Sequence, residues 1–268
     1  MSDADLLRVA SEILDGSVAE FTGQLGAQAS VHKSAKDFAT EADLSIERHV
    51  SALLVERTGI GVHGEENGGP APSEGTVWVL DPIDGTANFS LGLPITAINL
   101  ALMRDGLPVI GLTWAPLLDQ RYAAVTGGPV FRNGKALPAL GRTKLADVAI
   151  AFGNVTANGG RRFPTRWRMA LLDLLAERSL RVRVLGSTAV EAAWAASGLV
   201  GGMIAFGNHP WDTCPGACLV RAAGGLVTDI DGTEHSLASR GLLAAAPGVH
   251  DELLAALAVV GPPADYLD

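Results

Sequence analysis

Apolar residues near the start of the chain recur about every three or four positions, which is the period of an amphipathic helix. The positions that carry this pattern are Leu6, Leu7, Ala10, Ile13, Leu14, Val18 and Phe21. Ser2 or Asp3 is suited to cap this helix. A second helix is predicted from Asp43 through Leu54, with Gly59 after its end.

The pattern then changes to short apolar runs separated by turn residues. Strands are predicted at 77–80, 95–104, 108–114 and 121–125. Beyond about residue 140, strands alternate with helices, which is typical of an α/β layer. Here the predicted strands are 147–152, 181–184, 202–206, 225–229 and 241–246, and the helices are 165–178, 187–197, 213–223 and 249–259. Pro138 and Gly141 therefore suggest an N-terminal α+β part, 1–140, and a C-terminal α/β part, 141–268.

Composition narrows the class of protein. The chain has 268 residues, 48% of them hydrophobic, which is enough for a substantial core. Its net charge of −9 argues against nucleic-acid or anionic-membrane binding, because both need a basic face. Cys214 and Cys218 lie four residues apart, so in a helix they share one face, and we expect them to be buried in the core. Neither a signal peptide nor a membrane span is predicted, so a cytoplasmic location is expected.

The most informative stretch runs from Trp78 to Phe89. A buried strand delivers Asp81, Pro82 is expected to end the strand pairing, and Asp84 follows three residues later. Gly85 allows a ligand to approach its backbone, and Thr86 begins a helical turn whose N–H groups favour an anion. Taken alone, this string also fits a turn that joins a strand to a helix.

Three other acidic positions have simple local explanations when each is taken alone. Asp43 and Asp212 fit helix caps, and Glu65 fits a solvated turn. If Glu65, Asp81, Asp84 and Asp212 converge, each pair at about 4 Å costs roughly 4 kcal/mol at an effective dielectric constant near 20. Such a cluster needs protons or cations, and an all-oxygen ligand set selects Mg²⁺, Mn²⁺ or Ca²⁺.

These motifs resemble the inositol monophosphatase family of lithium-sensitive, metal-dependent phosphatases. The matching residues are Asp37-x-x-Thr40-x-x-Asp43, Gly64-Glu65-Glu66, Trp78 to Thr86 with Asn88-Phe89, Trp211-Asp212 and Gly224-Gly225. Their order and spacing cover nearly the whole chain, which most resembles the actinobacterial inositol-monophosphatase-like proteins. The resemblance implies a layered α-β-α-β-α sandwich of the inositol monophosphatase and fructose-1,6-bisphosphatase type, often assembled as a homodimer.

The resemblance also implies the site residues. Glu65, Asp81 and the Ile83 carbonyl would hold one Mg²⁺, and Asp81, Asp84 and Asp212 a second, with Glu65 reaching a weaker third; Mn²⁺ is the alternative ion. Glu65, Thr86 and Asp43 form the implied catalytic set, in which Thr86 and Asp43 position and activate the attacking water. The implied substrate contacts are Asp84, Gly85, Thr86, Thr188 and Asp212.

Two positions depart from the family pattern. Ala205 stands where inositol-specific relatives carry a Glu that grips sugar hydroxyls. Gly186-Ser187-Thr188 matches the family's Gly-rich loop only loosely, and Thr188 fits either a contact to a substrate hydroxyl or a helix cap. A basic cluster, Arg161, Arg162, Arg166 and Arg168, precedes a helix and fits either a solvated face or a guide for a phosphorylated substrate.

The leading hypothesis is Mg²⁺-dependent hydrolysis of a small phosphate monoester, with inositol 1-phosphate as the first candidate. Histidinol phosphate, fructose 1,6-bisphosphate and 3′-phosphoadenosine nucleotides are rival substrates. A non-catalytic regulatory binding protein is the alternative of a different class. It is disfavoured because every acid of the motifs is present.

Overall fold

The structure is a computed structural model that describes residues 1–32, 38–155 and 162–267. Its helices are α1 (Asp3–Gly23), α2 (Glu41–Thr58), α3 (Thr86–Ser90), α4 (Thr165–Arg178), α5 (Thr188–Ala196), α6 (Pro210–Ala222) and α7 (Val249–Val260). The first nine strands are β1 (Ala29–His32), β2 (Phe38–Thr40), β3 (Val62–Gly64), β4 (Thr76–Asp84), β5 (Ala97–Arg104), β6 (Leu107–Ala115), β7 (Gln120–Val125), β8 (Phe131–Arg132) and β9 (Lys135–Ala136). The other strands are β10 (Ala149–Phe152), β11 (Arg181–Arg183), β12 (Gly202–Ala205), β13 (Leu226–Thr228) and β14 (Leu242–Ala245).

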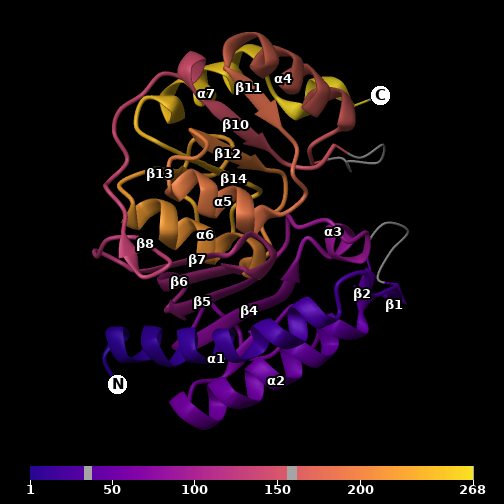
Figure 1. Ribbon diagram of the computed structural model, residues 1–268. Helices are drawn as coiled ribbons and strands as arrows, with labels where there is room; N and C mark the ends of the chain where they lie inside the picture. The colour runs from indigo at the N-terminus through magenta and orange to yellow at the C-terminus, as the bar shows by residue number, and fades with distance from the viewer. Residues whose placement is uncertain (33–37, 156–161, 268) are drawn as a thin grey trace.

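These elements lie in five layers (Figure 1). Helices α1 and α2 cover one face of a seven-stranded sheet of order β3-β4-β5-β6-β7-β8-β9. Helices α5 and α6 lie between that sheet and a five-stranded sheet of order β11-β10-β12-β14-β13, and α4 and α7 cover its far side. The predicted α-β-α-β-α sandwich is confirmed.

Strand β4 shows why the larger sheet needs helices on both faces. Trp78 and Leu80 pack in the cluster beneath α1 and α2, whereas Val79 packs with Cys214 of α6. Because successive side chains of a strand point to opposite faces, a continuous apolar run is buried only between two layers. The same run ends at Asp81, so the core fixes the position of the first acid.

The local predictions for the two N-terminal helices are confirmed. Ser2 caps α1 and accepts a hydrogen bond from the backbone N–H of Asp5. Gly59 ends α2 in the left-handed conformation, with φ of 70°. Cys214 and Cys218 are buried and unpaired by disulfide, as their helical spacing predicted.

One local expectation is wrong. Pro82 does not end the pairing of β4, which pairs with β5 through Asp81 and resumes at Asp84 opposite Ala97. The register shifts between the two acids, so this bulge accommodates the proline without terminating the strand. Because a bulge changes the alternation of side chains along a strand, both acids lie on the same side of β4, where a carboxylate oxygen of each is within 4.8 Å of the other.

The change from the larger to the smaller sheet falls between β9 and β10, close to the predicted boundary. Helix α6 packs against strands of both sheets, so the two parts share one interior layer. The division at residue 140 into two parts stays a prediction. Within the described ranges, every helix is too short or too polar to cross a membrane.

Candidate active site

A polar cavity of about 230 Å³ lies where the larger sheet meets the N-termini of the middle helices. Its wall includes eight of the predicted site residues: Glu65, Asp81, Ile83, Asp84, Gly85, Thr86, Thr188 and Asp212. They come from the end of β3, the end of β4, the starts of α3 and α5 and the first turn of α6. The fold therefore brings together acids that lie up to 147 positions apart, from residue 65 to residue 212.

Three of these acids form a tight cluster. One carboxylate oxygen from each of Asp81, Asp84 and Asp212 lies within 4.8 Å of the other two. Asp212 is held in place from the sheet, because the side-chain amide of Asn99 on β5 donates to the backbone carbonyls of Trp211 at 2.8 Å and Asp212 at 3.3 Å. The hydroxyl of Thr113 in turn donates to the amide oxygen of Asn99 at 2.8 Å.

Burial and like charge act together on these carboxyls. Burial raises the pKa of Asp81 well above its ordinary value, and the charges of Glu65, Asp84 and Asp212 raise it further. Burial also raises the pKa of Asp84 to about 7. Without a neighbouring positive charge, these carboxyls therefore hold their protons to higher pH than an exposed Asp does.

Asp84 is also bonded to the start of α5. The hydroxyl of Ser187, the N-cap residue, donates to Asp84 Oδ1, and backbone N–H groups of Thr188 and Ala189 also bond to this carboxylate. These bonds lower the pKa of Asp84 and oppose the effect of its burial. Ser187 is the N-cap of α5, and Thr188 is the first residue of this helix. The alternative that Thr188 caps the helix is therefore wrong.

Thr86 and Asp43 are in contact, as the resemblance implied. The hydroxyl of Thr86 lies 3.3 Å from Asp43 Oδ1 and 3.1 Å from the backbone oxygen of Ile83. Asp43 also accepts hydrogen bonds from the backbone N–H and hydroxyl of Thr40, at 2.8 and 2.6 Å. Thr40 is thus the N-cap of α2, and Asp43, the third residue of the helix, completes the capping box and contacts Thr86. Burial raises the pKa of its carboxyl, and the bonds from Thr40 oppose this shift.

Gly85 joins the acids to Thr86 in a conformation that suits glycine. Its φ is 83°, and a Cβ at this position would lie 3.0 Å from the backbone oxygen of Ile95 and 3.2 Å from that of Gly186. The chain therefore turns sharply at Gly85 while the start of α5 packs against it. Asn88 fastens the same junction, because its amide donates to the backbone oxygens of Ile95 and Leu185, each at 2.8 Å.

Glu65 is positioned by a residue that the sequence interpretation missed. Glu47, buried on α2, accepts hydrogen bonds from the backbone N–H groups of Glu66 at 2.8 Å and Asn67 at 2.9 Å. Gly64 has no side chain to obstruct this contact, since a Cβ there would lie 2.3 Å from the Glu47 carboxylate. In the sequence, Glu47 lies three residues before Val50 and seven before Leu54, on the apolar face of α2. An acid on that face is the signal that could have revealed it.

A second cavity of about 170 Å³ adjoins the first. Thr188, Asp212 and Asn154 line both cavities, whereas Ala205 and Arg168 line only the second. The interpretation of Arg168 as part of a solvated face is wrong, because its exposed fraction is 8%. Arg162 and Arg166 are exposed; Arg161 and Asp37 lie outside the described residues.

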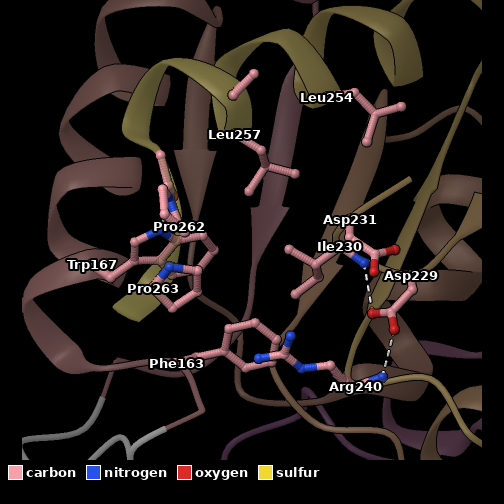
Figure 2. A pocket seen from close by; sticks show the side chains of 12 residues that line it. Phe163, Trp167, Asp229, Ile230, Asp231, Arg240, Leu254, Leu257, Pro262 and Pro263 are labelled. Atoms are coloured by element: carbon pink, nitrogen blue, oxygen red, sulfur yellow. Dashed lines mark hydrogen bonds between the residues drawn. The ribbon is translucent and has the colours of Figure 1, made fainter. Parts of the chain in front are cut away.

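A larger, mostly apolar cavity of about 480 Å³ lies beside α4 and α7 (Figure 2). Two acids line it. Asp229 accepts hydrogen bonds from the backbone N–H groups of Ile230 and Arg240, each at 2.7 Å, and Asp231 accepts from the backbone N–H and hydroxyl of Thr233. Both acids therefore hold local loops together. Among the described residues, the group of three potential metal ligands lies in the smaller, polar cavity, which makes that cavity the candidate site on chemical grounds.

The residues of the polar cavity fit a hard divalent cation. Its clustered donors are carboxylate oxygens, and Ile83 lines the same wall. The raised pKa values of Asp81 and Asp84 indicate that positive charge would relieve the repulsion among these acids. The fold and site together define a class of protein: a layered sandwich with a carboxylate metal site at the junction of its sheets.

Comparison with known proteins gives the family. The model of the inositol monophosphatase family matches residues 2–260. The probable inositol 1-monophosphatase ImpA of Mycobacterium tuberculosis is 49% identical over 263 residues, which cover 98% of this chain and 97% of that protein. This chain belongs to the inositol monophosphatase family, whose members are metal-dependent phosphatases that hydrolyse phosphate monoesters.

Two further relatives agree with this assignment. The fructose-1,6-bisphosphatase/inositol-1-monophosphatase of Thermotoga maritima is 32% identical over 178 residues, covering 66% of each chain. The structure of inositol monophosphatase from Anabaena superposes with a TM-score of 0.85 at 26% identity, covering 98% of this chain and 99% of that one.

The first prediction concerns pH. In the folded protein the pKa of Asp84 is about 7, against an ordinary value of 3.8. The proton on Asp84 therefore contributes fully to stability below the ordinary value, and this contribution is lost as the pH rises through about 7. One such group lowers the free energy of unfolding by roughly 1 kcal/mol between about pH 6 and pH 8. Thermal unfolding in EDTA should show this loss, and Mg²⁺ or Asp84→Asn should reduce it. Equal loss in all three samples would contradict the prediction.

The second prediction concerns Glu47. Glu47→Ala should weaken Mg²⁺ binding by roughly tenfold or more, because the loop that carries Glu65 loses its anchor. Calorimetric titration of the folded variant with Mg²⁺ measures this change. Glu74→Ala, an exposed acid just before β4, is the matched control. The same affinity in both variants would show that Glu47 does not position the site.

Proposed function

We propose that this chain is a Mg²⁺-dependent phosphatase that hydrolyses small phosphate monoesters and accepts inositol 1-phosphate. The observation that carries the proposal is the cluster of Asp81, Asp84 and Asp212 beside the contact between Thr86 and Asp43. The name of the mycobacterial relative supports inositol 1-phosphate as substrate. The name of the Thermotoga relative supports fructose 1,6-bisphosphate as a second ester to test.

The carboxylates would hold the cations in the first step of this account. Asp81, Asp84 and Asp212 supply one ligand set, and Glu65, Asp81 and the Ile83 carbonyl supply the other. A bound divalent cation supplies positive charge that polarises the phosphoryl oxygens and stabilises the leaving oxygen. The family resemblance adds three further parts to this proposal. The enzyme is inhibited by lithium, it assembles as a homodimer, and its cation is Mg²⁺ rather than Mn²⁺.

Thr86 would handle the attacking water. In this account the Thr86 hydroxyl donates to Asp43 Oδ1 at 3.3 Å rather than to the backbone oxygen of Ile83 at 3.1 Å, and a lone pair on Thr86 Oγ1 accepts a hydrogen bond from the water. Asp43 is suited to this role because burial raises the pKa of its carboxyl and makes it a stronger base than an exposed Asp. The backbone N–H groups of Gly85 and Thr86 would donate to the phosphate.

Asp84→Asn should lower turnover by roughly 10³-fold, because it keeps the shape of the side chain but removes one negative ligand charge. Phosphate release from inositol 1-phosphate, measured over a range of Mg²⁺ concentrations, tests this effect. Asp173→Asn on the exposed side of α4 is the control. Turnover close to that of the unmodified protein at saturating Mg²⁺ would rule out Asp84 as a ligand, and full activity after exhaustive chelation would rule out a metal mechanism.

Thr86→Ala should lower kcat by about 10²- to 10⁴-fold with a smaller change in KM, because the hydroxyl serves the water whereas the backbone amide still holds the phosphate. Thr86→Ser keeps the hydroxyl and should recover most of the turnover. Steady-state kinetics on the same ester separate the two constants. A raised KM with unchanged kcat would instead assign Thr86 to substrate binding.

A further inference from the structure

The larger cavity beside α4 and α7 is separate from the candidate active site. Its wall comes from the start of α4, the end of α7 and the loops beside β13 and β14 (Figure 2). The residues that line it differ from all of those that line the polar cavity and the second cavity. Its volume of about 480 Å³ lies within the range of about 300–1,000 Å³ that is typical of small-molecule sites.

Apolar side chains form most of this wall. The rings of Phe163 and Trp167 are almost fully buried and stack with their centres 5.5 Å apart. Trp167 is also held at its edge, because Nε1 donates to the backbone oxygen of Gly261 at 2.8 Å. Leu257 and Ile230 face the same space (Figure 2). The cavity therefore presents a fixed apolar surface to the side chain of a ligand.

Arg240 brings a positive charge to the edge of this surface. Its guanidinium carbon lies 5.6 Å from the centre of the Phe163 ring, and Figure 2 shows the side chain reaching toward that ring. Among residues 1–32, 38–155 and 162–267, none accepts a hydrogen bond from the guanidinium. Its donors are therefore available to an anion, and an arginine fork matches the two oxygens of a carboxylate.

Asp231 brings a negative charge to the same wall. Its Oδ1 accepts hydrogen bonds from the backbone N–H and hydroxyl of Thr233, at 2.9 and 2.6 Å, whereas no described residue donates to Oδ2. The bonds from Thr233 lower the pKa of the Asp231 carboxyl, and the charge of Arg240 lowers it further. The two opposite charges thus interact, but Arg240 nitrogens and Asp231 oxygens do not come within 4.0 Å of each other.

The other acid of the cavity is already satisfied. Asp229 is buried and accepts hydrogen bonds from the backbone N–H groups of Ile230 and Arg240, each at 2.7 Å, and from that of Gly241 at 3.0 Å. Three amide donors compensate its charge, since hydrogen bonds stabilise the ionised form of a carboxyl. Asp231 and the guanidinium of Arg240 therefore remain as the two charged groups that a ligand can pair with.

We propose that this cavity binds an α-amino acid with a large apolar side chain. The ammonium group would lie at Asp231 Oδ2 and the carboxylate at the guanidinium of Arg240, with the side chain against Phe163 and Trp167. An amino acid carries both charges beside one carbon, so it bridges two opposite charges that do not pair directly. A ligand with one charge would leave one of these groups without a partner. This inference is independent of the proposed phosphatase function.

Matched ligands test the need for both charges. Calorimetric titration of the unmodified protein, in saturating Mg²⁺, compares L-phenylalanine with 3-phenylpropionate, which lacks the ammonium group, and with 2-phenylethylamine, which lacks the carboxylate. L-Phenylalanine should bind with a Kd on the order of 1 mM or tighter. Each analogue should bind about tenfold more weakly or worse, because one charge-assisted hydrogen bond is lost. L-Alanine should also bind more weakly, because it has no large apolar side chain.

Variants then assign the binding to this cavity. Arg240→Met and Asp231→Asn should each weaken binding of L-phenylalanine by about tenfold, because each removes one charge. Ala258→Trp should abolish binding, because Ala258 is an exposed residue of α7 that lines the cavity and the added ring would fill it. Arg178→Met and Asp173→Asn, at exposed positions of α4 outside the cavity wall, are the matched controls and should bind as the unmodified protein does.

Absence of binding at ten times the expected Kd would overturn the inference. Equal affinity for 3-phenylpropionate would show a site for apolar anions and would overturn the assignment to an amino acid. Binding that survives both Arg240→Met and Ala258→Trp would place the ligand elsewhere, as would a loss of binding in Asp84→Asn. Failure to hydrolyse phosphate esters, with amino-acid binding intact, would overturn only the proposed function.

Discussion

Repulsion among buried carboxylates is the constraint on which this structure depends. Asp81 and Asp84 are almost fully buried, and Asp212 meets them within 4.8 Å. Each pair of charges at about 4 Å costs roughly 4 kcal/mol at an effective dielectric constant near 20, which is a large part of the stability of a typical domain. Only protons or cations make this arrangement favourable at neutral pH. The site is therefore built for a partner with positive charge.

The layers of the fold explain how such an unfavourable cluster is held together. Strand β4 is fixed by apolar packing on both faces, so its terminal acids cannot move apart without disturbing the core. The middle layer contributes the beginnings of α5 and α6, and the partial positive charge at a helix N-terminus opposes part of the repulsion. Asn99 and Glu47 fix the backbone beside Asp212 and Glu65, and Ser187 donates to the Asp84 carboxylate itself. These contacts hold the acids together in spite of their mutual repulsion.

Much of this account could be predicted from sequence, since its signals are local. The period of the apolar residues predicts α1 and α2, and the apolar run before Asp81 predicts β4. Asp81, Asp84, Gly85 and Thr86 lie within one short motif, so their proximity follows from the chain itself. The convergence of Glu65 and Asp212 on this motif depends on packing between distant segments. Family resemblance implied that convergence, whereas spacing alone left each acid with a simpler explanation.

The unpredicted features depend on contacts between segments that are far apart in the chain. Glu47 is an ordinary helical acid until the loop after β3 folds over it. Arg168 belongs to a group of arginines, and such groups are usually solvated, but its side chain is buried and lines the cavity beside the acids. The bulge that realigns Asp84 depends on its pairing with β5, so the proline alone gave the wrong expectation. In each case the missing information was the identity of the partner.

The most direct test of the central claim is to locate bound cations by anomalous diffraction from crystals soaked in Mn²⁺, which takes the same oxygen ligands as Mg²⁺. If the acids are clustered to hold a divalent cation, strong anomalous peaks will lie within about 2.3 Å of carboxylate oxygens of Asp81, Asp84 and Asp212. Crystals that show Mn²⁺ only at exposed acids, with none at this cluster, would contradict the account.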